Sequence, residues 1–185
     1  HKRSWTERRK RQPRLASMLD FSAIFAAAAV FGVGLLILWS NPVRWVNRIV
    51  FTCSIHFTVW LAALYLAMTS AQGLFWLRWT TSIAALIPFH FWLVKEAIAS
   101  DLEELRGKRI VHAGAWLLVT GCLACITFTD YFIPSISTSE RRLHGPGYYV
   151  YMAGNLGLYF ALAVDSFNRI KFLSGGRRLA LQVWL

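Results

Sequence analysis

The 185-residue chain is 56% hydrophobic and 15% aromatic, with a mean hydropathy of +0.44 and a net charge of +11. This composition is too apolar for a soluble domain and indicates an integral membrane protein. The basic residues flank apolar runs of membrane length, and no nucleic-acid recognition motif is present. We therefore expect the lipid bilayer, and not a nucleic acid, as the partner of this surface.

Residues 1–18 form a basic tail that holds seven of the twenty Lys and Arg residues. The tail contains Pro13 and has no apolar periodicity, so we expect it to be disordered or to lie on an anionic lipid surface. The alternative is that Met18 is the natural start and that the upstream residues are not native. Recovery of tail peptides by mass spectrometry would exclude that alternative.

Residues 19–185 are expected to form an all-α, polytopic bundle of transmembrane helices. A helical run of about twenty apolar residues crosses the hydrocarbon core. Runs of this kind predict five complete spans and the start of a sixth, at about 21–39, 49–68, 73–94, 110–128, 148–164 and from 179 onward. The last run is still apolar at Leu185, so we expect the sequence to be a fragment of a longer protein.

Two prolines are expected to interrupt this pattern. Asn41-Pro42 predicts the end of the first helix and a turn, because proline cannot donate a backbone hydrogen bond and disfavours helix in the preceding residue. Pro88 predicts a kink inside the third span. Residues 95–109 contain four acids and four bases, and we expect them to extend the third helix beyond the bilayer as a short amphipathic segment.

The Lys and Arg residues of the loops predict the topology. The odd-numbered loops hold ten of them and the even-numbered loops three, which places the odd loops in the cytoplasm and the N-terminus outside. The basic tail adds seven on the even side, so this orientation depends on whether the tail is native. The topology-determining residues are Arg44, Arg48, Arg106, Lys108, Arg109, Arg177 and Arg178.

Few polar residues lie at membrane depth, where an ionisable side chain is costly and is a candidate functional group. His90 is the first candidate for ligand binding, because Pro88 frees backbone polar groups beside it and Trp92 is positioned to wall a small pocket. His56 on the second helix is the other candidate. For both histidines the favoured interpretation is a neutral imidazole that is hydrogen-bonded between helices.

The sequence predicts neither a metal site nor a cofactor. Two histidines on different helices without a carboxylate partner are weak evidence for a metal or haem. Cys122 and Cys125 form a C-x-x-C within an apolar helix, which we interpret as packing. Asp130 and Asp165 fall at helix ends, where capping or interfacial solvation is expected. No catalytic motif is present, which favours a binding, sensing or transport role.

Four groups of residues occur in an order that is known from one family. They are the Asn-Pro turn with Phe51 and Trp60, Pro88-x-His90-Phe91, Gly145-Pro146-x-Tyr148-x-x-Tyr151, and Arg177-Arg178-x-x-x-Gln182. In this order they resemble the seven-transmembrane N-terminal sensor region of bacterial sensor histidine kinases. The resemblance implies the bacterial inner membrane, a seventh helix, and a cytoplasmic output domain through which the protein forms a homodimer. The phosphorylated histidine would lie in that missing domain.

The expected function is therefore a membrane-embedded input module of a two-component signal-transduction protein. Such a module passes a change in helix packing, caused by an unknown small-molecule or lipid signal, to the output domain. Two alternatives stay open, namely a fragment of a small permease and a non-catalytic membrane anchor or assembly subunit. The sequence beyond Leu185 separates these functions.

Overall fold

The computed structural model of the protein describes residues 3–99, 108–135, 137 and 143–184. Over these residues the fold is helical and contains no strand, which confirms the all-α class. The helices are α1 (Arg3–Ser40), α2 (Trp45–Thr69), α3 (Gly73–Ala85), α4 (Ile87–Ala99), α5 (Lys108–Ile126), α6 (Pro146–Ile170) and α7 (Gly175–Trp184).

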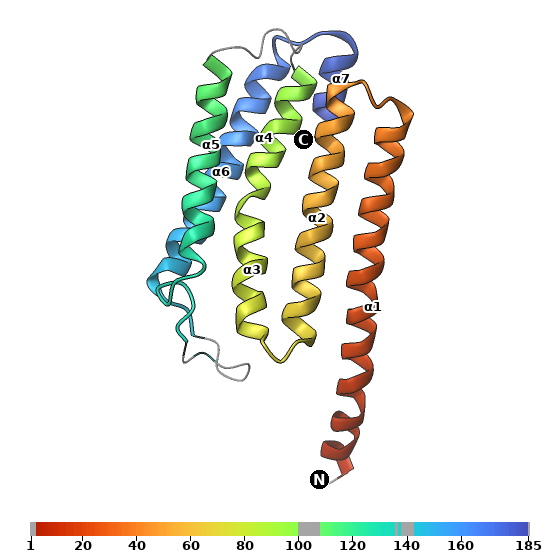
Figure 1. The fold of residues 1–185 in the computed structure, drawn as a ribbon, viewed down its shortest axis with the longest axis vertical. Coiled ribbons are helices and arrows are strands. Elements are labelled where there is room, and N and C mark those ends of the chain that lie inside the picture. Colours follow the sequence, from red (N-terminus) through yellow and green to blue (C-terminus); the bar gives the residue numbers. More distant parts are fainter. Residues whose placement is uncertain (1–2, 100–107, 136, 138–142, 185) are drawn as a thin grey trace.

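The long helices lie side by side in an elongated bundle, with α3 and α4 stacked end to end (Figure 1). The α1–α2 turn, the end of α4, the start of α5 and the α6–α7 turn share one end of the bundle, which is uppermost in Figure 1. We call it the α6–α7 end. The α2–α3 turn, the end of α5 and the start of α6 lie at the opposite end, and α1 extends beyond them.

The helix ends that carry the predicted topology-determining residues meet at the α6–α7 end (Figure 1). This is the arrangement expected of basic loops on one side of a membrane. Arg106 lies outside the described residues. The others are Arg44 and Arg48 at the start of α2, Lys108 and Arg109 at the start of α5, and Arg177 and Arg178 in the first turn of α7.

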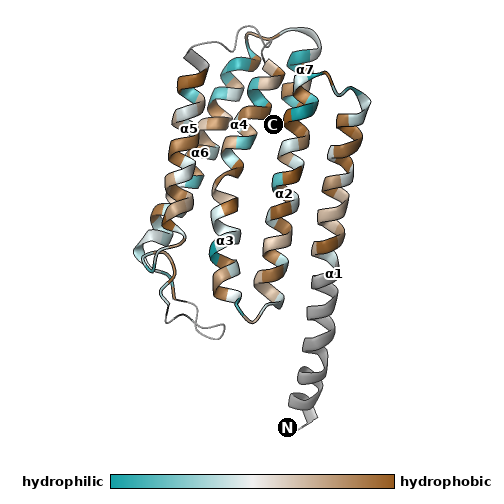
Figure 2. Cartoon of the chain, in the orientation of Figure 1, coloured by the Kyte–Doolittle hydropathy of each residue, from teal (hydrophilic) through white to brown (hydrophobic). Residues whose placement is uncertain are grey.

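Three helical segments are long and apolar enough to cross a membrane, which indicates a membrane protein. They are Ser22–Ser40, Trp45–Thr69 and Gly73–Ala99, the last of which combines α3 and α4. Apolar residues predominate along these segments (Figure 2). Phe25, Leu36 and Val59 are among the large apolar side chains exposed on them, as a surface facing lipid requires.

The prediction of five complete spans is not confirmed. The apolar part of α5 is the shorter segment Ile110–Ile126, which is not among the membrane-length candidates. The helix α6 has 25 residues, but its tyrosines, its glycines and Asn155 lower its mean hydropathy. The predicted span 148–164 therefore forms a helix without reaching the apolar character of the first three spans.

The first helix is longer than the sequence pattern predicts. It begins at Arg3, so the basic tail, which we expected to be disordered or to lie on the lipid surface, continues directly into the first span. The tail contains five Arg and two Lys, which are good helix formers, and in this structure that preference prevails over Pro13.

The predicted interruption of the third span lies at Leu86, between α3 and α4. The amide of Leu86 donates to the Ile83 carbonyl, 3.1 Å away, and the next regular bond joins the His90 amide to the Leu86 carbonyl at 3.2 Å. Pro88 has no N–H to donate to the carbonyl of Ala84, four residues before it, which explains why the helix breaks here. The break leaves polar backbone groups within a segment of membrane length.

The turn between α1 and α2 is fixed by one buried amide. The Nδ2 atom of Asn47 donates to the carbonyls of Ile37 at 2.9 Å and Asn41 at 3.0 Å, so it caps the end of α1 and holds the Asn-Pro turn. Arg48 reinforces the turn by donating from Nε to the Pro42 carbonyl at 2.7 Å. The predicted Asn-Pro turn is thus held by side-chain hydrogen bonds from Asn47 and Arg48.

The same helix pair packs closely at Gly34. A Cβ added to Gly34 would lie 2.4 Å from Cβ of Ser54, whereas a Cβ on Gly32 would meet nothing within 4 Å. Only a glycine at position 34 allows α1 and α2 to approach this closely.

Two buried clusters form the interior of the bundle. One joins α2 to α4 and contains Ile49, Cys53, Val94 and Ala97. The other joins α3, α5 and α6 with the α5–α6 connection, and it contains Ala85, Leu123, Ala124, Phe132, Ile133 and Tyr151. The half-helix α4 is therefore packed against α2 through apolar contacts, which brings the polar residues at its two ends next to their partners.

Candidate functional site

The two candidate histidines face each other across the break in the third span. His56 projects from α2, and His90 lies four residues after Leu86 in the first turns of α4. Their Nδ1 atoms are 2.7 Å apart, and the rings meet edge to face with centroids separated by 4.4 Å. The sequence predicted each histidine as a candidate but did not predict that they form one pair.

Hydrogen bonds fix which nitrogens carry protons in the neutral pair. The Nε2 atom of His56 lies 2.8 Å from the Ile83 carbonyl, which can only accept, so this nitrogen carries the hydrogen. The Nδ1 atom of His56 is then an acceptor, and Nδ1 of His90 donates to it. Nδ1 of His90 also lies 3.4 Å from the Leu86 carbonyl, which is a weak second acceptor. The pair thus joins α2 to both sides of the helix break.

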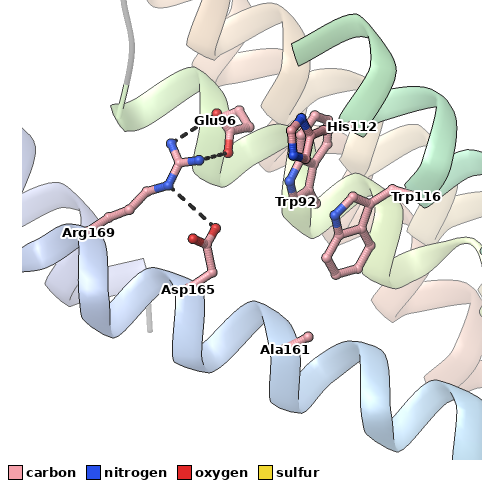
Figure 3. A pocket seen from close by; sticks show the side chains of 7 residues that line it. All are labelled: Trp92, Glu96, His112, Trp116, Ala161, Asp165 and Arg169. Atoms are coloured by element: carbon pink, nitrogen blue, oxygen red, sulfur yellow. Dashed lines mark hydrogen bonds and ion pairs between the residues drawn. The ribbon is translucent and has the colours of Figure 1, made fainter. Parts of the chain in front are cut away.

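Trp92, the third predicted site residue, lies away from the histidine pair. It is two residues after His90, and such residues point to different sides of a helix. Its indole stacks on Trp116 of α5, with centroids 6.3 Å apart and planes inclined by 21°. It lines a pocket between α4, α5 and α6, in which it is not joined by either predicted histidine (Figure 3).

A network of charged residues joins α4 to α6 near the α6–α7 end. Lys95, whose side chain is 0% exposed, forms an ion pair with Asp165 and lies 3.1 Å from Oε1 of Glu96. Arg169 approaches the same carboxylate through two nitrogens, with 2.8 Å to Oε1 and 3.1 Å to Oε2. Two cations and two anions balance each other, which is the condition for burying charge.

This network corrects two expectations. Residues Lys95 and Glu96 were expected in an amphipathic segment beyond the bilayer, but both side chains are buried within α4. Asp165 was expected to cap a helix or to be solvated at the interface, but it pairs with Lys95 and with Arg169 one turn later on α6, at 3.4 Å. Residues 100–107 of the expected segment lie outside the described part of the chain.

The electrostatic effect of the network is clearest at Asp165, which lies outside the three candidate spans. Burial alone would raise the pKa of its carboxyl group. The hydrogen bond and positive charge of Lys95, together with Arg169, outweigh burial and lower this pKa below its usual 3.8. Asp165 is therefore ionised over the physiological pH range and holds both cations.

The pocket beside the network has a volume of about 420 Å³ (Figure 3). Aromatic side chains form one part of its wall and the charged network forms another. Its lining residues are Trp92, Glu96, His112, Trp116, Ala161, Asp165 and Arg169. The pocket is large enough for a small molecule, and a ligand there would touch both α4 and α6.

The opposite end of the bundle is held by Arg78 of α3. Its guanidinium lies 2.5 Å from Oδ1 of Asp130 and donates to the carbonyls of Phe128 at 3.1 Å and Ile133 at 2.6 Å. Asp130, expected to cap a helix or face solvent, is thus an ion-pair partner. These contacts tie α3 to the segment after α5 and fix this end of the bundle.

Neither a disulfide nor a metal-binding group is found among the described residues. No cluster of three or more His, Cys, Asp or Glu residues occurs there, and the cysteines are free. Cys53 is buried, while Cys122 and Cys125 are exposed on α5. The packing role predicted for Cys122 and Cys125 is therefore not seen within the described residues, because both thiols lie on an outer, apolar face of α5.

No protein-family model, curated protein or solved structure matches the chain. Lys95, Glu96, Asp165 and Arg169 were not predicted as a group from the sequence. The sequence does show oppositely charged residues at the ends of two apolar segments. They predict ion pairs only when α4 and α6 are known to be neighbours.

Proposed function

We propose that the protein is a membrane-embedded input module of a bacterial signal-transduction protein, which passes a helix-packing change to an output domain. The observation that carries this proposal is the attachment of α4 at both of its ends. The His56–His90 contact ties its first turns to α2, and the charged network ties its last turns to α6.

The short helix α4 is suited to act as a moving part. It has 13 residues, is separated from α3 by the break at Leu86, and packs against α6 and α7. Networks of buried hydrogen bonds and ion pairs favour discrete arrangements, because intermediate geometries leave buried polar groups unpaired. A shift of α4 would therefore be transmitted to α6 and α7 as a switch between packings.

The pocket between α4, α5 and α6 supplies a place where a signal can act. A small molecule or lipid headgroup bound there would contact the aromatic wall and the charged network together. It would favour one packing of α4 by its difference in affinity for the two arrangements. In this proposal the signal binds between α4, α5 and α6, and the helix that moves in response is α4.

The resemblance to the seven-transmembrane region of sensor histidine kinases supports the same function. In this proposal the basic α6–α7 end faces the cytoplasm of the bacterial inner membrane, and the output domain is a kinase that forms a homodimer. A permease would need polar groups along a path across the bilayer. The polar side chains described above instead gather at the helix break and at the two ends of the bundle.

The reading frame beyond Leu185 tests the proposal first. A dimerisation helix with a phosphoacceptor histidine, followed by an ATP-binding domain, is the expected sequence. A stop codon soon after the next apolar helix would contradict the proposal.

Inverted membrane vesicles from cells expressing the whole reading frame provide the biochemical test. With radiolabelled ATP we expect acid-labile phosphorylation of the full-length protein. Absence of phosphorylation, together with solute uptake by the same vesicles, would contradict a sensor kinase and identify a carrier.

A further inference from the structure

One basic nitrogen of the His56–His90 pair takes part in none of the hydrogen bonds described above. Three of the four ring nitrogens take part in the contacts with each other and with the carbonyls of Ile83 and Leu86. The fourth, Nε2 of His90, has no polar partner among the described residues. In the neutral pair it carries no hydrogen, because Nδ1 of the same ring is the donor.

The geometry assigns a new function to this pair, and we propose that it is a binding site for one proton. A proton added to Nε2 of His90 makes that ring an imidazolium. Its Nδ1 still donates to His56 across 2.7 Å, and His56 still donates to Ile83. All existing hydrogen bonds are kept, and the bond between the rings becomes a stronger, charge-assisted one.

A second proton is excluded by the same geometry. If both rings were imidazolium, both Nδ1 atoms would carry hydrogens and would point at each other across 2.7 Å. Two like charges at this distance repel strongly in an apolar environment. The pair therefore binds one proton, and the second can bind only if the rings separate.

The helix break stabilises the bound charge. The carbonyl oxygens of Ile83 and Leu86 lie at the C-terminal end of α3, 2.8 Å from Nε2 of His56 and 3.4 Å from Nδ1 of His90, and their partial negative charges favour a cation there. Carbonyl oxygens at a broken helix within a membrane are a common way to stabilise a buried positive charge, and those of Ile83 and Leu86 each approach a ring nitrogen besides accepting a backbone amide. A metal ion between the two rings fits less well, since two nitrogens bound to one zinc lie about 3.3 Å apart or more.

The charged groups on the surrounding helices do not compete for the site. Residues 22–40 of α1, which packs against α2, contain no ionisable residue. On α2 the neighbouring ionisable groups are Cys53 and Arg48, and Arg48 donates to the Pro42 carbonyl. On α3 Arg78 is paired with Asp130, and on α4 Lys95 and Glu96 belong to the charged network. On α6, which also packs against α4, Asp165 and Arg169 belong to that network, Tyr151 donates to the Thr81 carbonyl, and Tyr159 contacts Phe91. His112 of α5 lines the pocket beside the network, and Arg177 and Arg178 lie in the first turn of α7.

Proton binding would act directly on α4. The charge is placed where α4 joins α3, and Lys95 follows His90 by five residues, which is about 7.5 Å along a helix. A change in the ring contact would tilt α4 about the break at Leu86 and shift the network at its other end. This consequence rests on the proposed signalling function, whereas the proton site itself does not.

Solid-state NMR of the full-length protein, labelled with ¹⁵N at histidine and placed in lipid bilayers, tests the site without any signalling assay. The pH is lowered from about 8 to about 5, across the range in which histidine titrates. We expect the nitrogen signals of His56 and His90 to change together in one step, with uptake of one proton by the pair. Separate steps for the two rings, or no change in either, would overturn the proposal.

Two variants sharpen the result. His90→Gln keeps an amide that can donate to His56 but removes the open nitrogen, so proton uptake at this site should be lost. His144→Gln, in an exposed position before α6, should remove its own signal and leave the step of the pair unchanged. Proton uptake by His56 in the His90→Gln variant would contradict the assignment.

The NMR result separates this inference from the proposed function. A single-step titration with no effect of pH on phosphorylation in the vesicle assay would support the proton site and contradict its signalling role. Phosphorylation that responds to pH equally in the wild type and in His90→Gln would show that another group is the pH-sensing site and overturn this assignment of the stimulus.

Discussion

Arg169 on α6 and Glu96 on α4 form a bidentate ion pair, with nitrogen–oxygen distances of 2.8 and 3.1 Å, and Glu96 is only 2% exposed. Paired contacts of this kind fix the relative orientation of two helices as well as their distance. Together with Lys95 and Asp165, this pair makes the end of α4 a well-defined contact on α6.

Removal of one cation from this network should destabilise the bundle. Arg169→Gln leaves a net negative charge beside buried Glu96, and the expected loss is about 2 kcal/mol. This lies below the ~3–5 kcal/mol typical of a broken buried pair, because Arg169 is about one-third exposed. Thermal denaturation in detergent micelles, followed by tryptophan fluorescence, measures the loss.

Two controls accompany this measurement. Lys171→Gln removes an exposed cation two residues later and should change the stability little. The double variant Glu96→Gln/Arg169→Gln restores charge balance and should lose less than the sum of its single variants. Strict additivity would show that the two side chains do not interact.

The stability of the bundle should depend on pH through the ionisation of Asp165. Its pKa in the folded protein is below the unfolded value of 3.8, so its contribution is fully present above about pH 4 and is lost as the pH falls through the folded pKa. Wild-type protein should therefore be more stable than Asp165→Asn near neutral pH. The difference should vanish at low pH, and a difference independent of pH would contradict the ion pairing.

Two glycine substitutions of identical chemistry should have opposite effects. Gly34→Ala places a methyl group 2.4 Å from Cβ of Ser54 and should destabilise the α1–α2 pair by about 1–3 kcal/mol. Gly32→Ala meets no atom within 4 Å and should be neutral or stabilising by up to ~1 kcal/mol, because alanine favours helix over glycine. Equal melting temperatures for the two variants would refute the close contact.

The role of Asn47 in holding the turn between α1 and α2 can be tested by substitution of this one buried side chain. Asn47→Asp keeps the shape but replaces the donor with an oxygen that faces two carbonyls, at a cost of about 1–3 kcal/mol. Hydrogen exchange in the turn should accelerate. The matched change Asn41→Asp keeps an acceptor for the Arg44 amide, so it should leave exchange nearly unchanged. Equal exchange in both variants would contradict the role of Asn47.

Much of the helical framework was predictable from apolar run length and from proline. The Asn-Pro turn and the interruption beside Pro88 follow from local backbone chemistry, and they appear where they were expected. The extension of α1 to Arg3 was not foreseen, because charge and a proline outweighed helix propensity in the interpretation of the tail. The membrane-length criterion also failed for α6, whose tyrosines and glycines reduce its apolar character.

The site was only partly predictable, for a physical reason. His56 and His90 are visible as polar residues in apolar runs, but their contact joins residues 34 positions apart and depends on how α2 packs on the break. Lys95 and Asp165 are 70 positions apart. No local pattern encodes such a contact, so buried Lys95 was mistaken for part of a solvated segment.

We propose that α4 is a hinged element whose position is set at the histidine pair. Pulsed EPR measures this movement, with spin labels at Ala99, the last residue of α4, and at exposed Val43 in the α1–α2 turn. The three native cysteines are first replaced by alanine, and the protein is kept in lipid bilayers. We expect the label distance to change between about pH 8 and 5 in this background and to stay constant when His90→Gln is added. An unchanged distance in the parent protein, or the same change in the His90→Gln variant, would contradict the account.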